Sequence, residues 1–401
     1  MRILTFKFIR DVLSRYYERA EIEDVPKIGM REFAFFIPDL KEGDIVERHI
    51  SFTDVEELRK YLIDKTPRDA YYSAAYYLEP TLEMDRKNLV EADLIFDIDA
   101  DHLEVEKEEI FVCTRCGVKE SSGDRCDDCG GELRKITWIT PTMLKKASEE
   151  TYKLVEILSN DFGIPYNELE IYFSGHRGYH VRVTTEWVRK MTQPERKEIV
   201  DYLICRGIDV ERHGIKFRGD IFQDPGGGWG RRIFNGLKRI IEIGEYRNFD
   251  FLSDNDKKRI EINKERILME IGEKGFSLLR KCLDRGKFMK IIEKSIEVSR
   301  VHLDPVVTQD MHRLFRLPGS VHGKIGLIKV RVKDVDELRS FDPFEWALLP
   351  FREEGKFRVY YSPRFNAGGD TYGPYQNEVV SLPICVGTIL VFKGLAEVER
   401  K

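Results

Sequence analysis

The sequence predicts a mixed α/β (α+β) fold in which a helical insertion interrupts a sheet-containing core. Short apolar runs bounded by turn residues are typical of strands, and they occur up to about residue 187 and again after residue 300. Between them, residues 195–298 have the charged pattern of surface helices. At 401 residues, the chain is long enough for two or three structural units. We expect a core of residues 1–204 and 299–401 and an insertion of residues 205–298.

The elements before the insertion follow from apolar spacing and from residues that end helices and strands. Pro38 is expected to end a strand and Gly163 a helix, and Thr53 or Asp54 is expected to cap another helix. The pattern predicts helices at 6–19, 53–63 and 141–161, strands at 31–38 and 93–99, a short aromatic segment at 69–80, and two strands joined by a turn at 169–187.

After the insertion, strand-like segments return. Their apolar runs are short and rich in β-branched residues, which favours strands. They are "VHLDPVV" at 301–307, "GKIGLIKVRV" at 323–332, "KFRVYYS" at 356–362 and "GTILVFKGLA" at 387–396.

Composition and charge indicate a globular protein. Hydrophobic residues make up 42% and charged residues 34% of the chain, and no apolar run reaches membrane-spanning length. The first residues lack a signal-peptide cleavage site, so we expect a cytoplasmic protein with no membrane partner. The net charge of −5 gives no sign of a nucleic-acid partner, although a balanced charge does not exclude a local basic groove.

Four of the seven cysteines are grouped in a metal-binding pattern. Cys113, Cys116, Cys126 and Cys129 follow the spacing C-x2-C-x9-C-x2-C, which places four thiolates around zinc. A closed set of four thiolates leaves no open position, so the zinc is expected to be structural. The alternative is a chance grouping of buried cysteines. We expect a zinc-binding segment at 111–135.

The run "EADLIFDIDADH" at 91–102 carries two carboxylates inside an apolar strand. Asp97 and Asp99 point to the same face because side chains alternate along a strand. A divalent cation would offset the cost of burying them, and carboxylates are the ligands that Mg²⁺ and Mn²⁺ prefer. The alternative is an exposed polar turn. Asp93 and Asp101 lie at the polar margins of the strand.

The segment "SGHRGYHVRV" at 174–183 is suited to phosphate binding. Ser174 and the neighbouring glycines predict a tight turn with free amides, while Arg177 and His180 supply donors for phosphate oxygens. The alternative is a surface hairpin whose histidine has an ordinary hydrogen-bond partner.

A third group of polar residues lies at 301–326. Asp304 precedes Pro305, where a strand would end, and supplies a third carboxylate. Asp310 competes for this role, but its place in the expected helix "TQDMHRLFRL" favours N-terminal capping. A third acidic ligand beside basic residues suits two-metal nucleotidyl transfer. The basic residues here are Arg313, Arg316, His322 and Lys324.

Taken together, these motifs resemble the small, catalytic subunit of the archaeal and eukaryotic DNA primases. They occur in the family's order across nearly the whole chain. The matching segments are "REF" at 31–33, "YYS" at 71–73, "DIDAD" at 97–101, the cysteine knuckle, "SGHRGYH" at 174–180, "RLPGSVHGKIG" at 316–326 and "VFKGLAE" at 391–397.

The resemblance implies a primase catalytic core of mixed sheets with a zinc knuckle and a variable helical insertion. It implies that Asp97, Asp99 and Asp304 are catalytic carboxylates binding Mg²⁺ or Mn²⁺. It further assigns phosphate binding to Ser174, Arg177 and His180, and contact with the incoming nucleotide to Arg316 and His322. The implied partners are a primase large subunit, single-stranded DNA template, and NTP or dNTP, in an archaeal cell and close to its nucleoid.

The chain also departs from the family pattern. Many archaeal relatives place a histidine among the zinc ligands, whereas four cysteines are available here. The insertion carries no recognisable motif, and its loop "DPGGGWGRR" at 224–232 is either a DNA contact or a solvated connector.

The predicted function is synthesis of short primers on single-stranded DNA for replication, by attack of a 3′-hydroxyl on the α-phosphate of a nucleotide with release of pyrophosphate. Three alternatives remain open: a related polymerase for end joining or gap filling, a metal-dependent nuclease, and a non-catalytic, zinc-stabilised nucleic-acid-binding protein.

Overall fold

The computed structural model describes residues 3–41, 43–113, 116, 119–120, 123–210, 228–273 and 276–399. The chain forms two compact units. The first comprises the chain up to Val155, Ile164–Arg196 and the residues from Leu303 onward; the second comprises Glu156–Gly163 and Lys197–His302. The predicted mixed α/β class is confirmed, with antiparallel sheets in the first unit and helices in the second.

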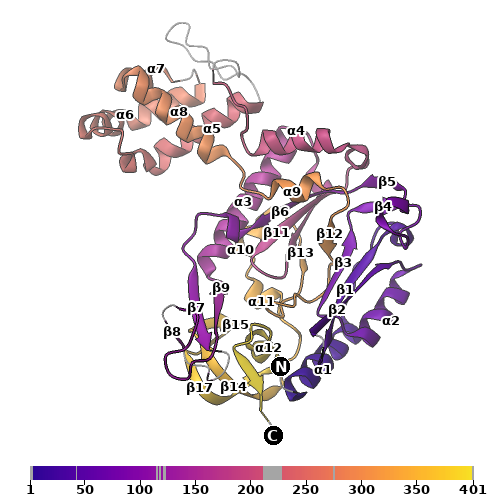
Figure 1. Cartoon of the computed structure of the whole chain (residues 1–401). Helices are drawn as coiled ribbons and strands as arrows, with labels where there is room; N and C mark the ends of the chain where they lie inside the picture. Colours follow the sequence, from indigo (N-terminus) through magenta and orange to yellow (C-terminus); the bar gives the residue numbers. More distant parts are fainter. Residues whose placement is uncertain are drawn as a thin grey trace. The chain divides into compact units, whose positions relative to one another are not determined.

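One four-stranded sheet of the first unit has the order β12-β3-β1-β2, and every neighbouring pair is antiparallel. α2 (Val55–Lys65) lies along the side of this sheet that faces away from the second sheet (Figure 1). Asp54 caps α2 by accepting a hydrogen bond from Glu57 N, as the sequence predicts. The strands are β1 (Phe33–Asp39), β2 (Gly43–Ile50), β3 (Asp69–Ser73) and β12 (Leu314–Arg316).

Pro38 does not end its strand. β1 continues to Asp39, with Pro38 opposite Asp44 near the turn into β2. A proline is tolerated at such a strand end because the ladder does not need its missing N–H there.

The second four-stranded sheet has the order β13-β10-β11-β6 and is also antiparallel. Asp97 lies opposite His180, and Asp99 lies opposite Gly178. α9 (Pro305–Gln309) packs against β6 (Figure 1). The sheet therefore brings the predicted acidic and basic segments together. Its strands are β6 (Leu94–Asp99), β10 (Leu169–Phe173), β11 (Gly178–Val183) and β13 (Val330–Val332).

The remaining small sheets are local. One, of order β8-β7-β9, carries the cysteine segment, and another, of order β17-β14-β18, lies near the C-terminus. Further helices of the first unit are α1 (Ile3–Arg19), α10 (Val335–Ser340) and α11 (Pro343–Trp346), and α3 (Pro141–Asn160) begins in it. The strands are β4 (Ala75–Tyr77), β5 (Leu89–Ala92), β7 (Glu108–Cys113), β8 (Lys119–Glu120), β9 (Leu133–Trp138), β14 (Glu354–Ser362), β15 (Phe365–Ala367), β16 (Asp370–Tyr372), β17 (Tyr375–Pro383) and β18 (Ala396–Val398).

The predicted strand at 387–396 is wrong. Most of this segment belongs to α12 (Ile384–Phe392), a helix whose residues from Cys385 to Phe392 are all buried. A short segment that is apolar on every side shows neither the helical nor the strand period, so the pattern could not separate the two.

The helices of the second unit surround a core of their own. Leu237, Ile240, Phe288 and Ile291 belong to this core and are fully buried. The helices are α5 (Gly228–Ile243), α6 (Asp254–Glu273), α7 (Ser277–Cys282) and α8 (Arg285–Ser299), with the end of α4 (Gln193–Leu203). The predicted loop at 224–232 is partly wrong, because residues 228–232 begin α5; the rest of it lies outside the described residues.

Across the part of the chain that the structure describes, no helix is both long enough and apolar enough to cross a membrane.

Candidate active site

The end of β6 presents two carboxylates on one face. Ile98, between them, is buried, whereas the side chain of Asp97 is 26% exposed and that of Asp99 is 32% exposed. Phe96 points to the buried face, as the predicted alternation requires. β6 therefore directs both acids away from the core.

Asp304 joins this pair through the backbone. Its N–H donates to the carbonyl oxygen of Asp97 at 3.1 Å. The predicted strand before it is wrong, because Asp304 is instead the N-cap of α9, with Oδ1 accepting from Val306 N at 2.9 Å. Pro305 explains the change, since proline is favoured at the first position of a helix.

Asp310 is not the N-cap that we expected. It ends α9 as the C-cap, and its Oδ1 accepts from His312 N at 2.9 Å. Asp304 and Asp310 thus lie at opposite ends of α9, and Asp304 is the one beside Asp97.

The carboxylates of Asp99 and Asp304 disfavour the charge of Asp97. Burial raises the pKa of Asp97 to about 7, and the neighbouring Asp99 and Asp304 carboxylates add to this effect, while Arg313 and Lys329 oppose it. Among the described residues, only the four cysteines bring three or more ligand atoms within 4.8 Å of one another, so the aspartate oxygens converge less tightly. A divalent cation would relieve the repulsion between them.

The turn between β10 and β11 packs directly on the loop that follows β12. Gly175 has φ +88°, and a Cβ built there would lie 3.1 Å from the Cβ of His322. The rings of His176 and His322 stack with centroids 4.7 Å apart. Ser174 Oγ accepts weakly from His176 N at 3.4 Å. Sequence reasoning missed His176, although it lies inside the "SGHRGYH" motif.

Arg177 faces the acidic side of the site. Its Nε donates to Asp99 Oδ1 at 3.0 Å, and its guanidinium also pairs with the Asp101 carboxylate. The structure thus brings together the predicted phosphate-binding arginine and a predicted metal ligand.

His180 is neutral and lies beside Asp97. Its Nε2 is 3.5 Å from Asp97 Oδ1. Burial lowers the pKa of His180 well below its usual range, with further lowering by Lys329 and Arg316. Its Nδ1 is buried and has no hydrogen-bond partner among the described residues. A buried unpartnered ring nitrogen is expected where a ligand supplies the missing partner.

Arg316 is held by protein groups. It is 5% exposed, and its Nη1 lies 2.6 Å from Asp69 Oδ1 and donates to Val321 O at 2.9 Å. Its Nη2 donates to the hydroxyl of Tyr71 at 2.9 Å. The predicted nucleotide contact is therefore oriented by β3 and by its own loop.

The burial of Asp93 differs from what the sequence predicts. Asp93 was expected at a polar margin, but it is 2% exposed and bonds to Arg31 Nη2 at 2.7 Å and to the Tyr76 hydroxyl at 2.8 Å. Arg182 and Arg189 also lie within 4.0 Å of its carboxylate. Asp93 is a structural anchor, and Arg31 of the "REF" motif is its main partner.

The four cysteines converge as predicted. Sulfur–sulfur distances are 3.5 Å for Cys113 and Cys129, 3.6 Å for Cys116 and Cys126, and 3.4 Å for Cys129 and Cys116. Tetrahedral zinc with bonds of about 2.3 Å requires separations of about 3.8 Å. The residues therefore fit a structural zinc ion.

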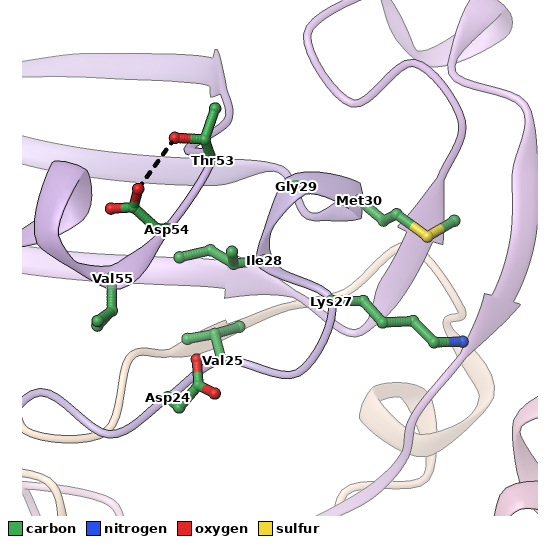
Figure 2. Close-up of a pocket in the computed structure, with 9 residues that line it drawn as sticks. All are labelled: Asp24, Val25, Lys27, Ile28, Gly29, Met30, Thr53, Asp54 and Val55. Atoms are coloured by element: carbon green, nitrogen blue, oxygen red, sulfur yellow. Dashed lines mark hydrogen bonds between the residues drawn. The ribbon is translucent and has the colours of Figure 1, made fainter.

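A separate hollow lies at the start of α2 (Figure 2). Thr53 Oγ1 and Asp54 interact at its rim, Asp54 is used to cap α2, and Lys27 Nζ pairs with Glu91 at 2.6 Å. Figure 2 shows Lys27 directed away from Thr53 and Asp54. Thr53, Asp54 and Lys27 thus have structural partners, and none of the predicted site residues lines this hollow.

Comparison with known proteins identifies the family. A family model described as DNA primase small subunit matches residues 96–334. The chain is 30% identical over 399 residues to the DNA primase small subunit PriS of Nitrosopumilus maritimus, covering 98% of each chain. The chain belongs to the DNA primase small-subunit family. It is also 32% identical over 402 residues to the PriS of Archaeoglobus fulgidus, covering 99% of this chain and 100% of the relative.

Membership of the DNA primase small-subunit family confirms the predicted resemblance. It makes the chain a nucleotidyltransferase and indicates a role in DNA primer synthesis. The matched residues 96–334 contain every predicted acidic, phosphate-binding and cysteine ligand. The primase segment and the site described above therefore coincide.

Proposed function

We propose that this chain synthesises short primers on single-stranded DNA by joining a 3′-hydroxyl to the α-phosphate of an incoming NTP or dNTP, with release of pyrophosphate. The observation that carries this proposal is the meeting of β6 and α9. There, Asp97, Asp99 and Asp304 come together across from the basic turn at 174–178. An acidic group facing a basic group is what nucleotidyl transfer requires.

Asp97, Asp99 and Asp304 would hold two Mg²⁺ or Mn²⁺ ions. Such ions, when bound, lower the pKa of the attacking hydroxyl and neutralise charge on the phosphates. The raised pKa of Asp97 supports this role, because a carboxylate that is costly to ionise alone gains most from a cation. Asp304 takes part through a position fixed by its cap and by its bond to Asp97.

The basic side would bind the triphosphate. Arg177 and His180 supply donors near the acids, and Ser174 begins the turn that packs on the loop carrying His322. Arg316 would offset charge from a fixed position, because Asp69 and Tyr71 orient it. His180 would act as a hydrogen-bond donor and not as a cation, since its pKa is lowered.

The partners follow from the names of the relatives. They are named small subunits, so we propose a primase large subunit as the partner of this chain, with single-stranded DNA and nucleotides as substrates.

The test is primer synthesis by the purified chain. Single-stranded DNA is incubated with NTP or dNTP and with Mg²⁺ or Mn²⁺, with and without the large subunit. We expect products without any supplied primer, together with pyrophosphate. Extension of a supplied primer only would indicate an end-joining or gap-filling polymerase. Release of nucleotides without pyrophosphate would indicate a nuclease and contradict the proposal.

A further inference from the structure

The "VFKGLAE" motif has no role in the site described so far, yet it contains a buried lysine. Lys393 is the C-cap of α12 and is 6% exposed. Its Nζ donates to Thr137 O of β9 at 3.1 Å and lies 5.2 Å from the centroid of the Trp138 ring. Among the described residues it forms no ion pair with a carboxylate. A buried ammonium group without an anion is costly, which raises the question of what balances it.

The surroundings of Lys393 are cationic. The guanidinium of Arg134 packs against the adjacent Gly394, where a Cβ would collide with it. Arg177 and Arg134 add to burial in lowering the pKa of Lys393 to about 8. Lys393 and Arg177 also lower the pKa of the buried His176, after burial itself. A Cβ at Gly326, in the loop that carries His322, would lie 3.3 Å from the ring of Phe392, so the end of α12 packs on that loop immediately before Lys393. Because the His322 ring stacks on that of His176, Lys393 lies close to the turn at 174–178.

The positive charges near His176 are only partly balanced. Arg177 pairs with Asp99 and Asp101, and Arg316 pairs with Asp69. In the described part of the chain, neither Lys393 nor Lys324 pairs with a carboxylate. The site thus has excess positive charge around His176, and such an excess favours an anionic ligand.

We propose that Lys393 is a phosphate-binding residue of the nucleotide site and contacts the triphosphate of the incoming nucleotide. The inference rests on the proposed function and extends the basic side of that site to α12. A nucleotide phosphate is favoured over a DNA phosphate because Lys393 follows Phe392, which packs on the loop carrying His322, and the His322 ring stacks on that of His176 in the predicted phosphate turn. Lysine binds phosphate as a compact point charge.

The competing explanation is a structural clamp between α12 and β9. Lys393→Gln distinguishes the clamp from phosphate binding, because glutamine keeps a hydrogen-bond donor for Thr137 O and removes the positive charge. Lys393→Arg keeps the charge, and Lys393→Met removes both donor and charge. Lys135→Gln is the matched control, since Lys135 lies on β9, the strand of Thr137, but is exposed and pairs with Glu109.

The experiment measures binding of a non-hydrolysable NTP with Mg²⁺ by calorimetry, binding of a single-stranded oligonucleotide, thermal melting and zinc content. For Lys393→Gln we expect nucleotide Kd to rise about tenfold, as for loss of one charge-assisted contact. DNA affinity, zinc content and Tm should not fall, because removing an unbalanced buried charge does not destabilise the fold. Lys393→Arg should stay within about threefold of wild type.

Unchanged nucleotide affinity in Lys393→Gln and Lys393→Met would overturn the proposal. The proposal would also be overturned if Tm and zinc content fell together with nucleotide affinity in every variant. That result would indicate the structural clamp. A loss of DNA affinity alone would assign the anion to the template and overturn the nucleotide contact. Failure of the proposed function is distinguishable, because the wild-type chain would then bind nucleotide without making primers.

Discussion

The surroundings of Asp97 strongly disfavour its charged form. Burial and the two other carboxylates raise its pKa to about 7, and His180 offers only a neutral ring beside it. The fold thus holds an acid in a place that disfavours its charge. Perturbed acids of this kind cluster at functional sites, because a substrate or ion supplies the missing compensation.

Replacing Asp97 should separate activity from stability. We expect Asp97→Asn to lower nucleotide incorporation by about 10³-fold, since a charge-stabilising ligand is lost. The Tm should stay equal or rise, because a partly buried charge that its neighbours repel is removed. Primer-extension kinetics and calorimetry measure the two effects. Asp310→Asn is the control and should retain activity, because Asp310 only ends α9. Equal losses in both variants would contradict the ligand assignment.

The raised pKa of Asp97 also predicts a pH dependence of stability. An unfolded aspartate has a pKa of about 3.9, whereas that of folded Asp97 is about 7. The folded state therefore binds the proton more tightly, and the contribution of Asp97 to the free energy of unfolding falls as pH rises from about 4 to about 7. Denaturant titrations at several pH values without Mg²⁺ should show this fall, and Asp97→Asn should lack it. An identical slope in both proteins would exclude Asp97 as its source.

At the scale of single elements, β11 and β6 approach each other closely beside Asp99. Gly178 permits this contact, because a Cβ there would collide with Ile98 O and lie 3.0 Å from Asp99 Cα. Gly178 thus belongs to the predicted phosphate-binding turn and also allows the close backbone approach of β11 to β6.

We expect Gly178→Ala to force β11 from β6 and to destabilise the protein by about 1–3 kcal/mol, as overpacking does. Nucleotide incorporation should fall with it, because Asp97 and Asp99 lie on β6 directly opposite the displaced strand. Gly29→Ala is the control, since the nearest atom to its added Cβ is 3.8 Å away. Denaturant unfolding and primer extension measure the two effects. Unchanged stability and unchanged incorporation in Gly178→Ala would show that β11 and β6 adapt to the added Cβ.

The cysteine segment is a second element with a testable role. Cys113 ends β7, and Cys126 lies before β9, so zinc would tie the ends of that small sheet together. We expect wild type to contain one zinc per chain and Cys126→Ser to lose it. Hydrogen exchange should then increase in β7 and β9, while β6 and β11 keep their protection. Uniform loss of protection would mean that the zinc supports the whole first unit. Cys385→Ser is the control, because Cys385 lies in α12 outside the cluster.

At the scale of the whole molecule, the two compact units have separate cores. Phe288 and Leu237 belong to the helical unit, whereas the predicted site residues all lie in the first unit. We therefore expect a change in the helical core to leave the predicted site residues in place.

Phe288→Ala should destabilise the helical unit by about 3–5 kcal/mol, because it creates a cavity in that core. We expect calorimetry to show an earlier transition for this unit and nucleotide affinity to stay unchanged. Ile262→Ala, at an exposed position on α6, should change stability by less than about 0.5 kcal/mol. A parallel loss of nucleotide affinity in Phe288→Ala would show that the units are energetically coupled.

Much of the fold could be predicted because its signals are local. Asp54 and Gly163 mark helix ends by their own backbone chemistry, and the hairpin at 169–183 follows from two apolar runs around a glycine turn. α12 could not be predicted, because burial on every side removes the period that separates helix from strand.

The sequence by itself determined the cysteine spacing, the paired Asp97 and Asp99, and the order of the primase motifs, because each depends on neighbours in the chain. Only the tertiary structure decided that Asp304 caps a helix beside Asp97 and that Asp93 is buried as an anchor for Arg31. It also decided that the end of α12, with Lys393, packs near the phosphate turn. The physical reason is that burial and charge compensation depend on contacts between residues far apart in the sequence, and pattern within one segment carries no record of them.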